Sequence, residues 1–315
     1  MTALAGAALQ ATVAVGCVPA AAALASASWP RRSPGAAILL WQALGLGWGL
    51  AAVGALASLG VAPRRAGVVG GVLDVAARAE TGRLIGAGQP AIPAALRLLC
   101  LAAGIALLAM LCWVLVAAFA AVLSARRRHR SLLALLARCD PKVPGALVVD
   151  HPAVAAYCVP GLRSRIVVSA GTLDLLRPLE LAAVLAHERA HVRERHDLVL
   201  LPFTALGRAF PRSRTSAQAC SAVALLIEML ADDRVRRDRP ARELAAALVR
   251  FGMAGSSHAP SGTLAAADPC DGEMTARVAR LLEPAPRLPL TGLAVIWCAA
   301  FALVTVPVAL LVLPF

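Results

Sequence analysis

Two histidines and a glutamate stand in a short stretch whose spacing suits metal chemistry. The chain reads His-Glu-Arg-Ala-His from His187 to His191, inside a segment from Leu179 to Arg195 that we expect to be helical. Residues four apart share one face of a helix, so both imidazoles can reach a single metal ion. Glu188 then lies beside that ion, where its carboxylate can act as a general base. The pattern predicts one zinc ion per chain, in a site of the kind that hydrolyses peptide bonds.

A third ligand is expected from a second helix, because catalytic zinc commonly has three protein ligands. Glu228 is the best candidate. It stands in an apolar part of a predicted helix, residues 217–236, where an unpaired buried carboxylate would be costly. Asp232 lies one turn later on the same face. We expect it to accept a hydrogen bond from a ligand histidine, with Asp233 as the alternative for that role.

Hydrolysis also needs a hydrogen-bond donor for the negative charge that develops on the substrate carbonyl oxygen. Tyr157, Arg195 and His196 are the candidates for this or another substrate contact. We nevertheless expect ordinary packing for Tyr157 and an exposed position at a helix end for His196. Arg165–Ser169 is a predicted strand, as is Leu147–Val149. If Arg165–Ser169 forms a sheet edge beside the site, it could bind an extended substrate by strand addition.

The composition indicates a membrane protein. Hydrophobic residues fill 59% of the 315 positions, and the mean hydropathy is +0.74, which is too apolar for a soluble globular protein. Four apolar runs, at about 2–27, 35–62, 94–123 and 288–312, each exceed the ~20 residues that cross a hydrocarbon core. The first run could be a signal peptide, but no Lys or Arg precedes it. We therefore expect four transmembrane helices.

The charges predict how the chain is oriented. The formal net charge is +13, and the arginines flank the apolar runs. This favours the positive-inside pattern of a multi-pass protein of the bacterial plasma membrane over direct nucleic-acid binding. Residues 124–287 would then be a cytoplasmic domain inserted between three transmembrane helices in 1–123 and a fourth in 288–315. The 63–93 loop carries arginines on the outer side and could lie on the membrane surface.

The fold class expected from these patterns is a mainly α integral membrane protein. Its cytoplasmic part would be a gluzincin-like α+β zinc metallopeptidase domain. Eight cysteines are scattered without a C-x-x-C pair, which favours a reducing compartment for the polar part. Residues 255–272 are rich in Gly, Ser and Pro and predict a mobile loop that could gate the site.

Three segments also carry a family resemblance: Tyr157–Gly161, Arg165–Leu173 and Leu181–His191. In this order they resemble the beta-lactam-sensor antirepressor (BlaR/MecR-type) family of membrane metallopeptidases. Glu228 with Ala231–Asp233 is similar to that family's third-ligand motif. The resemblance is strong over about 145–236. Gluzincin proteases of the HtpX and CaaX-protease type share a similar order and are the nearest alternative.

The resemblance implies His187, His191 and Glu228 as zinc ligands and Glu188 as the catalytic base. It also implies that the zinc domain cleaves a cytosolic winged-helix repressor, in signal transduction. The antibiotic sensors carry a penicillin-binding domain after the last membrane helix, whereas this sequence stops at Phe315. We therefore expect a signal to enter through the membrane helices, the 63–93 loop or a partner.

Two other functions remain open at this point. One is an HtpX-like peptidase for membrane protein quality control or processing, and the other is a non-catalytic membrane signalling protein with a structural metal site. The intact Glu188 argues against the second, because a structural site needs no base. The expected partners are a protein substrate and the lipid bilayer, and a homodimer is compatible with the sequence.

Overall fold

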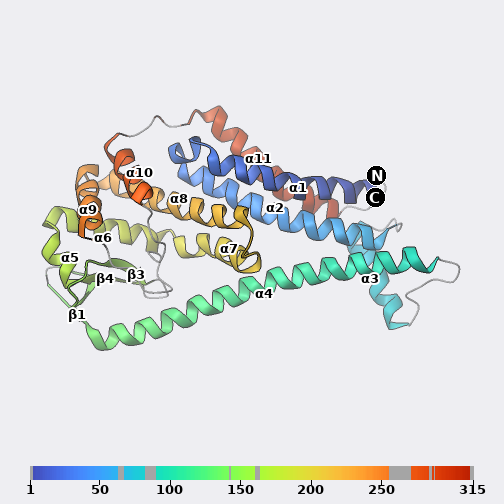
Figure 1. Cartoon of the computed structure of the whole chain (residues 1–315), viewed down its shortest axis with the longest axis horizontal. Helices are drawn as coiled ribbons and strands as arrows, with labels where there is room; N and C mark the ends of the chain where they lie inside the picture. The colour runs from blue at the N-terminus through green and yellow to red at the C-terminus, as the bar shows by residue number, and fades with distance from the viewer. Residues whose placement is uncertain are drawn as a thin grey trace.

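A computed structural model describes residues 3–62, 67–81, 90–141, 143–159, 164–254, 271–283, 286 and 288–312. Helices dominate the fold, and one small sheet lies at the end distant from the termini (Figure 1). The elements are α1 (Ala3–Ser26), η1 (Trp29–Arg32), α2 (Pro34–Val61), α3 (Gly67–Glu80), α4 (Ala91–Leu136), β1 (Ala137–Cys139), β2 (Ala146–Val149), β3 (Ala156–Val159), β4 (Arg165–Ser169), α5 (Ala170–Leu175), α6 (Pro178–Arg193), α7 (His196–Ala209), α8 (Arg214–Asp238), α9 (Ala241–Ala254), α10 (Asp271–Leu282) and α11 (Leu290–Val312).

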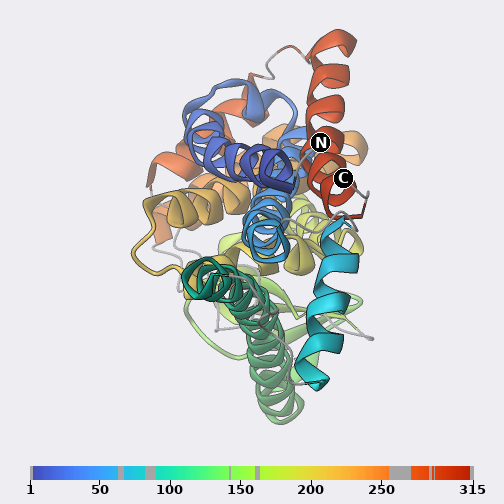
Figure 2. The ribbon, with the colours of Figure 1, turned by 90° about the vertical axis from the view of Figure 1, so that its right-hand side faces the viewer.

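Four helices of the described chain, α1, α2, α4 and α11, are long and apolar enough to cross a membrane, by length and composition. They coincide with the four apolar runs of the sequence. Figure 2 shows α1, α2 and α11 grouped together, and α2 contacts each of the others. The long apolar helices indicate membrane association. Helix α4 continues beyond its apolar run to Leu136 and reaches the first strand of the sheet.

The sheet has the strand order β1-β2-β4-β3. Strands β2 and β4 are parallel, and the other two pairs are antiparallel. Both strands predicted from the sequence are confirmed, at Ala146–Val149 and Arg165–Ser169. The prediction that Arg165–Ser169 could form a sheet edge is wrong, because β2 and β3 pair with its two sides. The edge strands are β1 and β3, and β3 contacts α6.

The two faces of the sheet pack against different helices. Val148 and Val168 pack with Leu185 of α6 on one face. Tyr157 and Val167 pack with Leu133 of α4 on the other. Alternate residues of a strand point to opposite faces, so neighbouring positions in β4 serve two separate clusters. The sheet therefore holds α6 at a fixed distance from the end of α4.

Helices α7 and α8 form a hairpin that packs on α1 and α2 (Figure 1). The shared core includes Trp41, Phe203, Val223 and Ile227, each at most 2% exposed. Phe210, at the hairpin tip, meets Trp48 of α2 edge to face, with ring centroids 5.4 Å apart. The hairpin that supplies Glu228 is thus anchored directly on two of the candidate membrane helices.

Close approach of α11 to α2 depends on Gly47. A Cβ added there would lie 2.6 Å from the backbone oxygen of Leu303, and small residues allow such contacts between membrane helices. We expect Gly47→Ala to lower the stability of the protein by about 1–3 kcal/mol, as overpacking does. Gly16→Ala is the matched control, because no atom lies within 4 Å of its added Cβ. Thermal unfolding in detergent measures both. Equal midpoints for the two variants would contradict the prediction.

Candidate functional site: a His-His-Glu metal centre

Three ligand atoms from two helices converge at the site. Nε2 of His187 lies 3.0 Å from Nε2 of His191, and both belong to α6. The Glu228 carboxylate, from α8, approaches these nitrogens at 3.2 and 3.4 Å. All three donor atoms lie within 4.8 Å of one another. The structure thus brings together the three residues that the sequence analysis assigned as ligands.

The donor set fits a zinc ion. Two imidazole nitrogens and one carboxylate oxygen are a known ligand set of catalytic zinc, which leaves a further position for water or substrate. The two histidines are almost fully buried, whereas Glu228 is partly exposed. When bound there, Zn²⁺ would polarise the substrate carbonyl and favour ionisation of water. His187, His191 and Glu228 would hold it.

Glu188 follows the first ligand on α6 and is 8% exposed. Burial raises the pKa of its carboxyl group above the usual range, and the charges of His191 and His187 oppose this effect. A carboxylate with a raised pKa is a better proton acceptor near neutral pH. Its position beside the ligands, with its burial, suits a general base.

Asp232 supports His187 from one turn along α8. Its Oδ1 lies 3.1 Å from Nδ1 of His187, which is ion-pair distance without good hydrogen-bond alignment. Burial lowers the pKa of His187, but the contacts with Asp232 and Glu228 outweigh it and raise that pKa to about 10. Asp233 points elsewhere and pairs with Arg280 at 2.7 Å. Of the two aspartates weighed from the sequence, the structure places Asp232 at the histidine.

Arg277 of α10 is a member of the site that the sequence analysis missed. Its guanidinium donates to Asp232 at 2.8 and 2.9 Å, and its Nη1 lies 2.9 Å from Glu228. Burial raises the pKa of Asp232, but the charge of Arg277 and the contact with His187 lower it to about 2. Arg277 stands 45 positions after Asp232, and no local pattern marks it. The sequence signal that could have found it is an arginine in the amphipathic segment that follows α8, the helix that carries Glu228 and Asp232.

Removing Arg277 should destabilise the protein. Arg277→Gln leaves the buried Asp232 and the partly exposed Glu228 without their cation, and breaking a buried pair costs about 3–5 kcal/mol. Arg280→Gln is the matched control, because its partner Asp233 is more exposed than Asp232. We expect the larger drop in thermal midpoint for Arg277→Gln when both proteins are metal-free. Equal drops would show that burial of the Arg277 pair does not matter.

The turn between α6 and α7 positions His196 against the ligands. Arg195 adopts a left-handed backbone, φ 53°, which no other non-glycine residue of the described chain does. The turn places Nδ1 of His196 2.9 Å from Nδ1 of His191, and Glu194 holds the other His196 nitrogen at 3.2 Å. His196 is 1% exposed, so the expectation of an exposed helix-end histidine is wrong. Arg195 itself is exposed and makes the turn.

Burial beside a second histidine sets the charge of His196. Burial and the nearby His191 together lower its pKa to about 4, against the opposing effect of Glu194. His196 is therefore neutral at physiological pH, and its ring can share one proton with the ring of His191. It acts on the metal site by orienting a ligand histidine rather than by contributing charge.

Tyr157 lies on the other side of the sheet. Its hydroxyl is 3.0 Å from Nε2 of His129 in α4, and its ring packs with Leu133. The structure therefore does not bring Tyr157 to the ligand atoms, because successive side chains of β3 point to opposite faces. His129 lies among the arginines that follow the apolar run of α4, and it is half-buried in this contact. Together with the Arg126–Asp197 ion pair at 3.0 Å, it fixes α4 to the domain.

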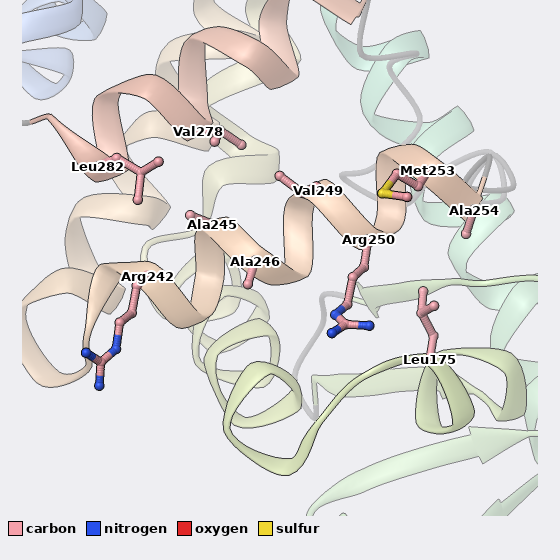
Figure 3. Close-up of a pocket in the computed structure, with 10 residues that line it drawn as sticks. All are labelled: Leu175, Arg242, Ala245, Ala246, Val249, Arg250, Met253, Ala254, Val278 and Leu282. Atoms are coloured by element: carbon pink, nitrogen blue, oxygen red, sulfur yellow. The ribbon is translucent and has the colours of Figure 1, made fainter.

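A groove between α5, α9 and α10 is separate from this centre. Its volume is about 730 Å³ (Figure 3). The lining is apolar apart from Arg242 and Arg250, and it contains no histidine or carboxylate among the described residues. Arg250 also pairs with Glu180 of α6 at 3.2 Å. The predicted gating loop, 255–272, lies almost wholly outside the described residues, apart from the first two residues of α10.

The site combines a small sheet, a helix with the His-Glu-x-x-His motif, and a second helix that carries Glu228. Residues 122–231 match the model of peptidase family M48, which supports a metallopeptidase. The match does not test the resemblance to antirepressor peptidases. No curated protein and no solved structure matches the chain.

Proposed function

We propose that this protein is a membrane-embedded zinc endopeptidase that cleaves a cytosolic protein. The observation that carries the proposal is the convergence of His187, His191 and Glu228 within 4.8 Å, with buried Glu188 beside them. A structural metal site would need no buried base next to its ligands. The alternative of a non-catalytic membrane signalling protein therefore has less support.

In the proposed reaction, different residues of the site have different roles. Glu188 takes the proton of the attacking water and passes it to the leaving amine. Asp232 and His196 orient the two ligand histidines through their Nδ1 atoms. The free edge of β3 can pair with an extended substrate segment and guide it along α6. An endopeptidase needs such an open edge, because its substrate continues in both directions past the cleaved bond.

The proposed substrate is a winged-helix transcriptional repressor, and its cleavage would transmit a signal. Support comes from the resemblance over about 145–236 to antirepressor peptidases. Arginines after the apolar run of α4, from Arg126 to Arg130, favour a cytoplasmic domain by the positive-inside rule. The domain would then meet a cytosolic DNA-binding protein directly.

A second candidate is a quality-control peptidase for membrane proteins. The observation in its favour is the core that α7 and α8 share with α1 and α2. That packing places the ligand helix α8 directly against candidate membrane helices, so membrane-protein segments would be within reach.

Comparison of new protein N-termini in cells that express the wild type or Glu188→Ala separates these functions. A Glu188-dependent cut in one DNA-binding repressor is the expected result. Glu188-dependent cuts spread over many membrane proteins would move the assignment to quality control. If zinc is bound and no cut depends on Glu188, even under envelope stress, the peptidase proposal fails.

A further inference from the structure

A second hollow lies between α2, α4, α7 and α11, away from the metal centre. Its volume is about 890 Å³, in the range of about 300–1,000 Å³ for small-molecule sites. The lining contains no charged side chain among the described residues, and it includes Trp48, Leu111, Leu206 and Trp297. The hollow therefore suits an apolar occupant.

The two most polar side chains in this groove are already satisfied. Gln42 donates from Nε2 to the backbone oxygen of Val199 at 2.8 Å. Thr305 donates from its hydroxyl to the backbone oxygen of Phe301 at 2.9 Å. An occupant would gain little from polar groups here, so hydrocarbon is the chemistry that fits.

The groove lies among candidate membrane helices that carry exposed apolar side chains. Three of its four walls are candidate membrane helices, and the lining residues of α2 and α4 lie in the middle parts of those helices. On α11, Trp297 is 59% exposed and Phe301 is 72% exposed. Apolar side chains this exposed would face lipid, so the groove is continuous with the hydrocarbon around it.

The α7–α8 tip, which follows the groove-lining residue Ala209, carries three arginines, which we call the tip arginines: Arg208, Arg212 and Arg214. All three are exposed at the α7–α8 tip, and none forms an ion pair within the part of the chain that the structure describes. No Asp or Glu occurs from residue 198 to residue 227. The tip is fixed beside the groove, because Ala209 lines it and Phe210 packs on Trp48.

The depth of this tip makes an anionic partner necessary. Trp48 stands near the middle of α2, a candidate membrane helix, so the tip arginines lie within reach of the bilayer interior. An unpaired arginine is costly in hydrocarbon, and such residues pair with an anion or reach the head groups. A lipid phosphate meets this need, because arginine forms strong paired hydrogen bonds with phosphate.

We propose that this groove binds the acyl region of an anionic phospholipid whose phosphate pairs with the tip arginines. Hydrocarbon walls and the tip arginines select the two parts of the same molecule. The α7 helix that forms one wall begins at His196, next to the ligand His191. A bound lipid would therefore touch the helix that also supports the metal site. The proposal does not depend on peptidase activity.

Tryptophan quenching by brominated acyl chains tests the proposal in the full-length protein. One variant keeps only Trp48, with phenylalanine at the other four tryptophan positions. A second keeps only Trp113, which is 72% exposed on α4 and does not line the groove. Both are reconstituted in phosphatidylcholine vesicles with 10 mol% of the lipid brominated, as either phosphatidylglycerol or phosphatidylcholine. At this low fraction, on the order of a tenth, a tryptophan is strongly quenched only if the brominated lipid is enriched beside it.

We expect brominated phosphatidylglycerol to quench Trp48 at least about twofold more than brominated phosphatidylcholine does. Trp113 should show no such preference. Arg208→Gln/Arg212→Gln/Arg214→Gln should abolish the preference at Trp48, whereas the matched control Arg127→Gln/Arg128→Gln should keep it. Equal quenching of Trp48 by both lipids would overturn the proposal. So would no quenching by either, which is the result if a protein segment fills the groove.

A measurement on otherwise native protein covers the case in which the single-tryptophan variants fail to fold. Gly45 lines the groove, and its added Cβ would lie 3.7 Å from Leu206, so Gly45→Phe should fill the space. Lipid analysis of purified wild type should find about one anionic phospholipid per chain, and Gly45→Phe should lose most of it. Equal amounts in both proteins would contradict the proposed site.

Discussion

Replacing Glu188 by glutamine should reduce peptide hydrolysis by about 10²–10⁴-fold, which is the usual contribution of a general base. Glutamine has nearly the same shape but cannot accept the proton of the attacking water. Zinc binding should survive, because the three ligand atoms belong to His187, His191 and Glu228. The change therefore separates the chemistry of the site from its assembly.

The measurement is the turnover rate of a purified repressor or peptide substrate, together with the zinc content of the same preparation. Glu243→Gln is the matched control, because this glutamate lies on α9 and pairs with Arg242. Activity within a factor of ten of wild type in Glu188→Gln would rule out Glu188 as the base. Loss of zinc in that variant would instead assign Glu188 to metal binding.

Replacing Glu228 by glutamine should weaken zinc binding by more than about 100-fold. Loss of an outer partner of a ligand histidine costs about 10–100-fold in metal affinity, and loss of a direct ligand costs more. The change also removes one carboxylate partner of Arg277, at 2.9 Å, so the cation remains at the site with less negative charge around it. Both effects disfavour a divalent cation.

Competition with a chromophoric zinc chelator gives the dissociation constants. Asp232→Asn should fall in the 10–100-fold range, because Asp232 touches His187 and not the ion. Asp233→Asn is the matched control: its carboxylate pairs with Arg280, and zinc affinity should stay as in wild type. If Glu228→Gln and Asp233→Asn bind zinc equally well, Glu228 is not a ligand.

The metal motif and the apolar helices follow from the sequence alone, because local spacing determines them. His187 and His191 are four residues apart, and any regular helix places them on one face. The four apolar runs became helices because in each run the apolar stretch is long enough to cross a bilayer, and only a helix satisfies its backbone polar groups internally there. Strands at Ala146–Val149 and Arg165–Ser169 were also evident, from β-branched residues between turn residues.

The role of Glu228 was indicated by the local sequence, but its position depends on the tertiary structure. Its apolar neighbours in the sequence indicated a cation partner, but only packing of α8 on α6 places its carboxylate 3.2 Å from His187. The structure places this carboxylate beside the two histidines, and its role as a metal ligand stays a prediction.

Other features were decided only by the tertiary structure, because they join residues distant in sequence or depend on pairing partners. Arg277 reaches Asp232 from α10, and no periodicity connects the two. His196 is buried because the left-handed turn at Arg195 folds α7 back against His191. Arg165–Ser169 is an interior strand because β2 pairs with one side of it and β3 pairs with the other. The sequence determined which residues could bind a metal, and long-range packing determined which charges surround it.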